Sequence, residues 1–276
     1  MNKLMSSHLA RLRKDKVFWL CMASVLVYAV ACMLNGCGQA SVDMSEYNYT
    51  LDKFYFHFAL SIGAFISVFS SMFLGTEYSD GTIRNKIVVG HTRTEIYLSN
   101  LLLTFTASML MMLVWIVGAM VGIPFLGFWN MGAGQLLTYL LIAVLFTAAL
   151  CAVFTMIGSL SENKTVGAVV SLLLFLGLLI LASIIQNILN EPEMTSGVII
   201  TADGMDLSEP TPNPNYVSGT ARAVLAFILD LLPTGQGIQM AFLEIVTPMR
   251  MILSSVFMTV SVTVCGLFFF RKKDLK

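Results

Sequence analysis

Apolar residues fall into long continuous runs that are separated by short polar segments. A hydrocarbon core about 30 Å thick is crossed by a helix of about 20 apolar residues, so each long run predicts a membrane span. Six runs are long enough, at about 17–35, 56–75, 97–122, 135–158, 166–189 and 251–270. The pattern predicts an all-α polytopic membrane protein, with residues 1–16 as an N-terminal segment and residues 17–276 as a six-span transmembrane domain. The first run exceeds a signal-peptide core, so we expect it to be a retained span.

A seventh apolar run, at 223–232, is too short to cross a bilayer and is broken by Asp230 and Pro233. We expect it to form an external re-entrant hairpin before the last span. It belongs to the largest external segment, 190–250, whose first half is rich in Pro, Asn, Ser and acidic residues. That composition favours a flexible acidic loop over a folded domain.

The positions of lysine and arginine predict the orientation. With the N-terminus inside, the cytoplasmic segments carry 13 of the 16 lysines and arginines. Cytoplasmic segments are typically enriched in these residues, so both termini are expected in the cytoplasm. A full span at 223–232 would place the basic C-terminus outside, which is a second argument against it.

Composition agrees with a chain that is covered largely by lipid. Apolar residues make up 57% of the sequence and charged residues only 12%, about half the share of a soluble domain. The formal net charge is zero, which gives no indication of a nucleic-acid partner. The five cysteines include no CxxC pair, so we interpret them as small apolar packing residues.

The N-terminal stretch 3–15 is amphipathic. Apolar and basic residues occupy opposite faces at helical spacing, Leu4, Met5, Leu9 and Leu12 against Lys3, Arg11, Arg13 and Lys14. The pattern predicts a helix in the cytoplasmic interface, with its apolar face toward the membrane and its bases toward anionic lipid. A basic anchor without a fixed helix is the alternative.

The cytoplasmic loop after the second span predicts a short helix between Glu77 and Val89. Its apolar side is expected to contain Ile83, Ile87 and Val88, with the basic residues elsewhere. A short helix of mixed polarity between two spans is suited to docking into a groove on a soluble partner.

Local signals also predict how this short helix ends and the third span begins. Gly90 suits the left-handed position that follows a helix C-terminus. Thr92 and Glu95 have the spacing of a capping box. A rigid turn at Gly90 would pass movement of the short helix into the third span.

The same loop resembles a known family. The phrase Glu77-Tyr-Ser-Asp-Gly-Thr-Ile-Arg-Asn-Lys, followed by Gly90-His-Thr-Arg, is similar to the permease subunit of bacterial ABC transporters of the ABC-2 type. Members of that family share a Glu-Tyr-x-x-Gly-Thr phrase after the second span, then a Ser-Arg or Thr-Arg step. Leu232-Pro-Thr-Gly-Gln resembles the family's external re-entrant segment, and the ending from Phe270 resembles its C-terminus.

The resemblance implies half of a pathway in the bacterial cell membrane. A second permease subunit, identical or different, would complete it, and two copies of a separate ATPase would bind ATP and Mg and drive it. The implied ATPase-contacting residues are Glu77, Tyr78, Asp80, Gly81, Thr82, Arg84, Asn85 and Lys86. The implied turn into the third span contains Gly90, Thr92, Arg93 and Glu95, and a possible external gate contains Asp230, Pro233 and Gln236. A solvated loop that follows the charge rule is the alternative for the cytoplasmic residues.

The sequence contains no GxxxxGK[ST] phosphate loop, no HExxH and no GxSxG, so we expect neither an ATPase site, nor a metal or cofactor, nor enzymatic activity in this chain. The expected spans contain almost no ionisable residue, whereas ion-coupled transporters need one. This favours ATP-driven transport by a separate subunit. We expect an exporter, and a pathway lined by apolar and hydroxyl side chains suits a peptide, lipid-like or drug-like substrate. An ion-coupled secondary transporter, and a ligand-binding or immunity protein without transport, are the alternatives.

Overall fold

The computed structural model describes residues 2–42, 51–124, 126, 130–196, 198–201, 204–207 and 209–273. In chain order the helices are α1 (Asn2–Leu12), α2 (Lys16–Val42), α3 (Leu51–Tyr55), α4 (Phe58–Ser79), α5 (Thr82–Val88), α6 (Arg93–Ala119), the 3-10 helix η1 (Met120–Gly122), α7 (Ala133–Leu160), α8 (Lys164–Asn190), α9 (Gly219–Leu231), α10 (Pro233–Ala241) and α11 (Pro248–Lys272). The short strands are β1 (Met194–Thr195), β2 (Val198–Thr201), β3 (Gly204–Leu207) and β4 (Thr211–Pro212).

Within these described ranges, six helices are long and apolar enough to cross a membrane, which confirms the predicted six-span architecture. The spans are Lys16–Gly38, Phe58–Tyr78, Arg93–Gly122, Ala133–Leu160, Lys164–Asn190 and Pro248–Lys272. Most extend a few residues past the predicted bounds. The apolar run predicts only the apolar length of each helix, whereas the hydrogen-bonded helix continues into polar residues until a capping residue ends it.

The helix α4 lies at the centre of the bundle and packs against α2, α6, α7, α8 and α10. Two thirds (67%) of its most apolar window is buried, against 11% for α11, which packs on α7 at the periphery. Close approach at α4 depends on glycine, because a Cβ at Gly63 would lie 2.2 Å from the Phe175 ring and one at Gly75 would lie 2.5 Å from Lys164 Cβ.

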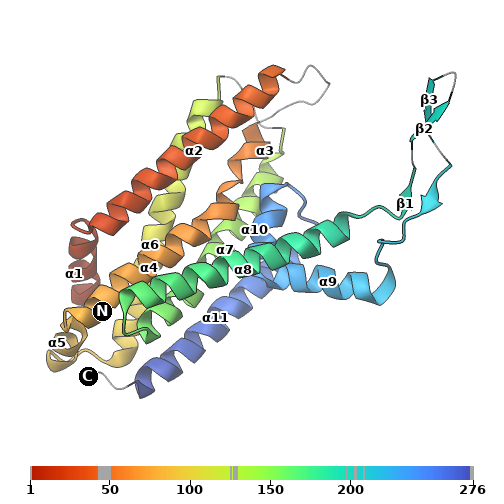
Figure 1. Cartoon of the computed structure of the whole chain (residues 1–276). Helices are drawn as coiled ribbons and strands as arrows, with labels where there is room; N and C mark the ends of the chain where they lie inside the picture. The colour runs from red at the N-terminus through yellow and green to blue at the C-terminus, as the bar shows by residue number, and fades with distance from the viewer. Residues whose placement is uncertain are drawn as a thin grey trace.

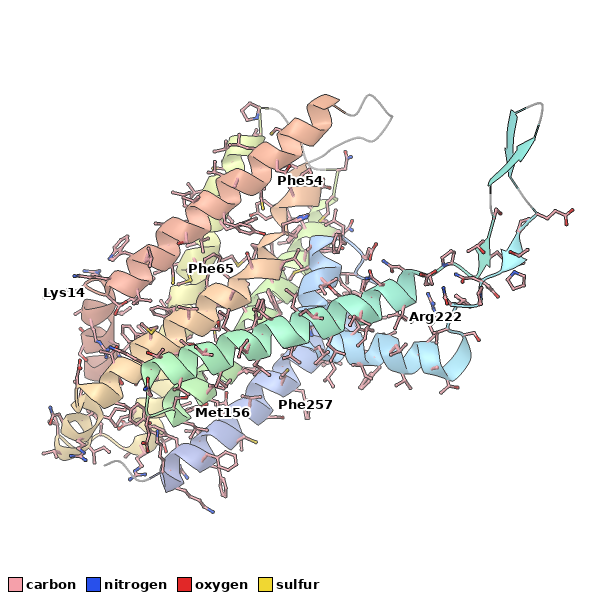
Figure 2. The ribbon with its side chains drawn as sticks, viewed as in Figure 1. Lys14, Phe54, Phe65, Met156, Arg222 and Phe257 are labelled. Atoms are coloured by element: carbon pink, nitrogen blue, oxygen red, sulfur yellow. The ribbon has the colours of Figure 1, made fainter. Side chains whose placement is uncertain are left out.

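The two ends of the bundle differ in their contents. The helices α1 and α5 and the C-terminal end of α11 gather at one end, whereas α3, α10 and the strands lie toward the other (Figure 1). Lys14 lies at the first end and Phe54 toward the second (Figure 2). This arrangement is expected for an even number of spans, because the chain returns to the end of the bundle from which it started.

The segment after α8 departs from the predicted flexible loop. The strand β1 pairs antiparallel with β4, and β2 pairs with β3 in the register Val198↔Leu207 to Thr201↔Gly204. The paired strands extend away from the bundle (Figure 1). Val198–Thr201 is rich in β-branched residues, which favour a strand. The flexible-loop prediction was based on the acidic composition of the whole segment, in which this four-residue run has little weight.

The helices α9 and α10 form the expected bent pair, with 95° between their axes. Leu232 is extended between them, and Pro233 occupies the first turn of α10, where its missing N–H costs no helical hydrogen bond. The bend is tight, because a Cβ at Gly235 would lie 2.1 Å from the Leu229 carbonyl oxygen.

Candidate functional site

The short helix α5 is a separate element bounded by two left-handed glycines. Gly81 has φ +65° and Gly90 has φ +100°, values that side-chain-bearing residues rarely adopt. These turns confirm the predicted helix stop at Gly90. The helix itself begins at Thr82, so Glu77 and Tyr78 are not part of it and instead form the last turn of α4.

The faces of α5 differ from the expected division in one respect. Ile83 is buried and Ile87 is partly buried, so these two residues of the predicted apolar side pack on the bundle. Val88 was expected on that side but is 85% exposed, and its neighbour Val89 is 79% exposed. Five residues rotate a helix by about 500°, which places Val88 well away from Ile83. The tip of α5 therefore presents two valines to the exterior, with exposed Arg84 nearby.

Glu77 is the centre of a buried polar cluster at this end. Its side chain is 1% exposed, and Oε1 accepts hydrogen bonds from Arg11 Nη1 at 2.8 Å and Lys86 Nζ at 2.7 Å. His8 Nδ1 lies 3.5 Å from the same oxygen. Glu77 was predicted to contact a partner protein, but the structure gives it an internal role that joins α1, α4 and α5.

His8 completes this cluster as a neutral group. Burial lowers its pKa to about 4, and the nearby Lys86 and Arg11 also lower it, although Glu77 acts in the opposite direction. The Lys86 ammonium lies 3.3 Å from Nε2 and donates to it, so the ring proton is on Nδ1 and faces Glu77. Burial also lowers the pKa of Lys86, and Glu77 partly restores it. The sequence did not indicate a role for His8, because a single histidine does not by itself predict a buried cluster.

The helix α1 packs on the protein with a different face from the one predicted. Leu4, His8 and Leu12 are buried, whereas Leu9 is 37% exposed. Arg11 was expected to point toward anionic lipid, but Nη2 donates to Phe73 O at 2.9 Å and the guanidinium lies 4.2 Å from the Phe73 ring centroid. The ion pair between Arg11 and Glu77 therefore sets which face of α1 packs on the protein, rather than the separation of apolar and basic residues alone.

The start of α6 is fixed on both sides. The predicted capping box is present, because Thr92 Oγ1 accepts from Glu95 N at 3.2 Å and Glu95 Oε2 accepts from Thr92 N at 3.0 Å. Arg93 Nη1 donates to the carbonyl oxygens of Arg271 at 2.8 Å and Lys273 at 2.5 Å. A cation at the C-terminal end of α11 also complements the helix dipole.

Tyr78 connects α4 to the ends of α7 and α11. Its hydroxyl donates to Ser159 O, and the Lys273 ammonium lies 4.0 Å from its ring centroid. Lys273 Nζ also donates to Leu160 O at 3.0 Å, and burial lowers its pKa. Contacts of this kind tie α1, α4, α5, α6, α7 and α11 into one unit beneath the exposed tip of α5.

The candidate gate residues lie together at the opposite end and are buried. Asp230 is 3% exposed and accepts from Arg250 Nε, Thr247 Oγ1 and, at 2.9 Å, Gln239 Nε2. The pairing with Arg250 was not expected, because sequence alone placed that residue only as one of three external bases.

Gln236 and Pro233 are also buried at this joint. Gln236 Nε2 donates to Asp230 O at 2.8 Å, and Gln236 Oε1 accepts from Ser255 Oγ at 2.6 Å. These bonds fasten α10 to α9 and to α11. The described residues contain no group of three or more His, Cys, Asp or Glu side chains that could hold a metal ion.

Six spans, a bent helix pair toward one end and a short helix held between two spans at the other end define a multi-pass membrane protein. A model of the ABC-2 family transporter proteins matches residues 4–188, which is more than half of the chain. The chain belongs to the ABC-2 transporter family, as the loop resemblance predicted. No curated protein matches the chain. Membership of this family implies association with an ABC-type ATPase subunit.

Proposed function

We propose that this chain is the permease subunit of an ATP-driven exporter in the bacterial cell membrane. ATP and Mg are bound by two copies of a separate ATPase, and a second permease subunit, identical or different, completes the pathway. Both termini and α5 face the cytoplasm, and α5 is the element that docks into the ATPase. The cargo is a peptide, lipid-like or drug-like molecule.

The exposed tip of α5 is the observation that carries this proposal. Val88 and Val89 are 85% and 79% exposed, at the end of the bundle that also contains α1 and the C-terminal end of α11. Val88, Val89 and the exposed Arg84 give a partner protein a small apolar contact with a charged residue at its rim.

The buried contacts behind α5 support a route for movement. Lys86 attaches α5 to Glu77 in α4, and Gly90 and the Thr92 capping box attach α5 to α6. A displacement of α5 by an ATPase would act on the second and third spans together, because both joints are short and fixed.

The charge pattern supports the orientation. Arg11, Arg84, Lys86, Arg93 and Lys273 lie in α1, α5, the start of α6 and the end of α11, which gather at one end of the bundle. That enrichment is characteristic of the cytoplasmic side.

Paired acids favour ATP coupling over the ion-coupled alternative. The buried Glu77 and Asp230 each have a cationic partner, Arg11 with Lys86 and Arg250 respectively. A carboxylate held in this way is poorly placed to bind and release a coupling ion during transport.

Co-purification tests the docking role. The chain is expressed with the ABC-type ATPase encoded beside it, and the double variant Val88→Asp, Val89→Asp is compared with wild type. We expect the double variant to retain less than about a tenth of the bound ATPase and of the stimulated ATP hydrolysis, the loss of a typical binding anchor. Thr165→Asp is the control, because it adds a charge to an exposed position next to the other short turn at this end.

The control is expected to bind the ATPase normally. Full binding by the double variant, with normal hydrolysis, would show that α5 is not the docking element. Glu77→Lys is unsuitable for this test, because a third cation beside Arg11 and Lys86 would disrupt the buried cluster itself.

A further inference from the structure

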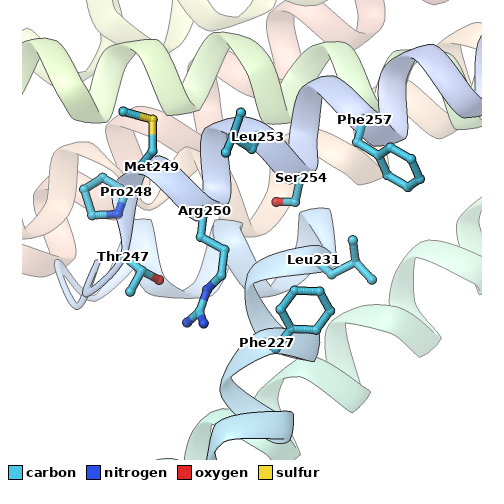
Figure 3. Close-up of a pocket in the computed structure, with 9 residues that line it drawn as sticks. All are labelled: Phe227, Leu231, Thr247, Pro248, Met249, Arg250, Leu253, Ser254 and Phe257. Atoms are coloured by element: carbon cyan, nitrogen blue, oxygen red, sulfur yellow. The ribbon is translucent and has the colours of Figure 1, made fainter.

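Two cavities meet at Thr247 and Arg250, where α9, α10 and α11 come together. One is an apolar cavity of about 780 Å³ between α9 and α11, in which Phe227, Leu253 and Phe257 form much of the wall (Figure 3). The other, here called the polar cavity, has a volume of about 560 Å³, extends toward the end of α8, and contains more polar side chains than the first. A ligand that fills both must be apolar at one end and polar at the other.

The apolar cavity opens outward between the two helices. Phe227, Leu253 and Phe257 are 52%, 63% and 66% exposed. These residues belong to helices that border lipid, so the cavity has the surroundings and the lining of a site for an acyl chain.

Arg250 stands at the boundary of the two cavities. Its Nε donates to Asp230, and its side chain extends from α11 toward α9 (Figure 3). Within the described residues, the two terminal nitrogens have no hydrogen-bond partner. A guanidinium whose outer edge is open is well suited to a phosphate.

Beside Arg250, the polar cavity contains the negatively charged side chain of Glu244. Glu244 Oε2 accepts from the side-chain amides of Gln186 and, at 3.3 Å, Asn190. No cation in the described part of the chain lies within ion-pair distance of Glu244. Gln186 is 8% exposed, and its buried Oε1 accepts no hydrogen bond from described residues. Glu244 therefore presents to the cavity a carboxylate that has no cationic partner among the described residues.

The formal charges of the polar cavity are balanced. Arg222 and Arg250 are positive, and Asp230 and Glu244 are negative. This balance favours a zwitterion over an anion. Because the exposed Glu244 carboxylate accepts N–H hydrogen bonds, a primary ammonium fits better than a quaternary one.

We propose that the joined cavities bind one phospholipid molecule with a primary-ammonium headgroup, of the phosphatidylethanolamine type. An acyl chain occupies the cavity between α9 and α11, the phosphate contacts Arg250, and the ammonium lies against the Glu244 carboxylate. Binding of this lipid does not depend on an ATPase, and it holds the α9–α10 pair against α11.

Native mass spectrometry of the full chain tests this site. The protein is delipidated in mild detergent and offered equal amounts of phosphatidylethanolamine, phosphatidylcholine and phosphatidylglycerol with identical acyl chains. We expect one retained lipid per chain, with phosphatidylethanolamine preferred by about tenfold, the effect of one charge-assisted hydrogen bond. Glu244→Gln is expected to keep a bound lipid and lose the preference over phosphatidylcholine.

Leu253→Trp tests the apolar cavity, since a larger side chain would fill it. Leu173→Trp is its control, because Leu173 on α8 has the same 63% exposure and lies outside the cavity. We expect Leu253→Trp to lose retained lipid and Leu173→Trp to keep it, with both variants equally stable to heat. Arg250→Lys keeps a cation beside Asp230 and is expected to weaken retention of every phospholipid.

Three results would overturn the proposal. The first is a wild-type chain that retains no lipid, including one that forms a lipid-free dimer across this face. The second is equal retention by Leu253→Trp and Leu173→Trp. The third is a preference for phosphatidylglycerol, which would show that Glu244 does not select the headgroup.

Discussion

The buried Glu77 cluster leads to a quantitative prediction about stability. Glu77→Gln removes the negative charge with little change in shape, and leaves Arg11 and Lys86 close together without their shared partner. Breaking a fully buried ion pair typically costs about 3–5 kcal/mol. Arg11 is 30% exposed and Lys86 14% exposed, so both can regain some solvent, and we expect a loss of about 2–4 kcal/mol.

The measurement is the free energy of unfolding in mixtures of mild detergent and dodecyl sulfate. Glu193→Gln is the control, because it makes the same chemical change at an exposed residue near β1. The control is expected to stay within about 0.5 kcal/mol of wild type.

A double-mutant cycle separates the Glu77–Lys86 contact from other effects of the substitution. Glu77→Gln, Lys86→Met and the double variant are compared with wild type, and we expect a coupling energy above about 1 kcal/mol. If Glu77→Gln costs no more than Glu193→Gln, or if the coupling energy is zero, the cluster does not hold α5 to α4.

Three further predictions concern single residues. The His8 pKa of about 4 in the folded chain lies below the ordinary 6.5, so stability should fall as pH falls from 6.5 toward 4, and a pH series of unfolding curves should lose this slope in His8→Gln. Thr92→Ala removes the capping-box acceptor and should lower the free energy of unfolding by about 1 kcal/mol, whereas an unchanged value would show that the cap contributes nothing. Gly235→Ala should cost about 1–3 kcal/mol because its Cβ meets the Leu229 carbonyl, while Gly177→Ala, with open space around it, should be neutral or stabilising in the same assay.

Local chemistry explains what could be predicted from the sequence. The six spans are visible because each must be apolar for about 20 residues, and the capping box at Thr92 and Glu95 acts over three residues. The stop at Gly90 is equally local, because it depends on a conformation that glycine alone adopts easily.

The contacts that remained hidden join residues that are distant in the sequence. Arg11 and Glu77 are 66 positions apart, and the pairing of Asp230 with Arg250 requires α9 and α11 to be brought together by the bend between α9 and α10. Glu77, which was expected to contact a partner protein, therefore forms its ion pairs within the chain. Val88 differs for a simpler reason, because the five-residue spacing from Ile83 turns it to another face of the helix.

The most direct test of the central claim is the reactivity of the α5 tip. In a chain whose five cysteines are replaced, Val88→Cys is treated with a membrane-impermeant maleimide. We predict labelling in inside-out vesicles, none in intact cells, and protection when the ATPase is bound. Labelling from outside the cell, or labelling in vesicles that the bound ATPase does not reduce, would contradict the docking role of α5.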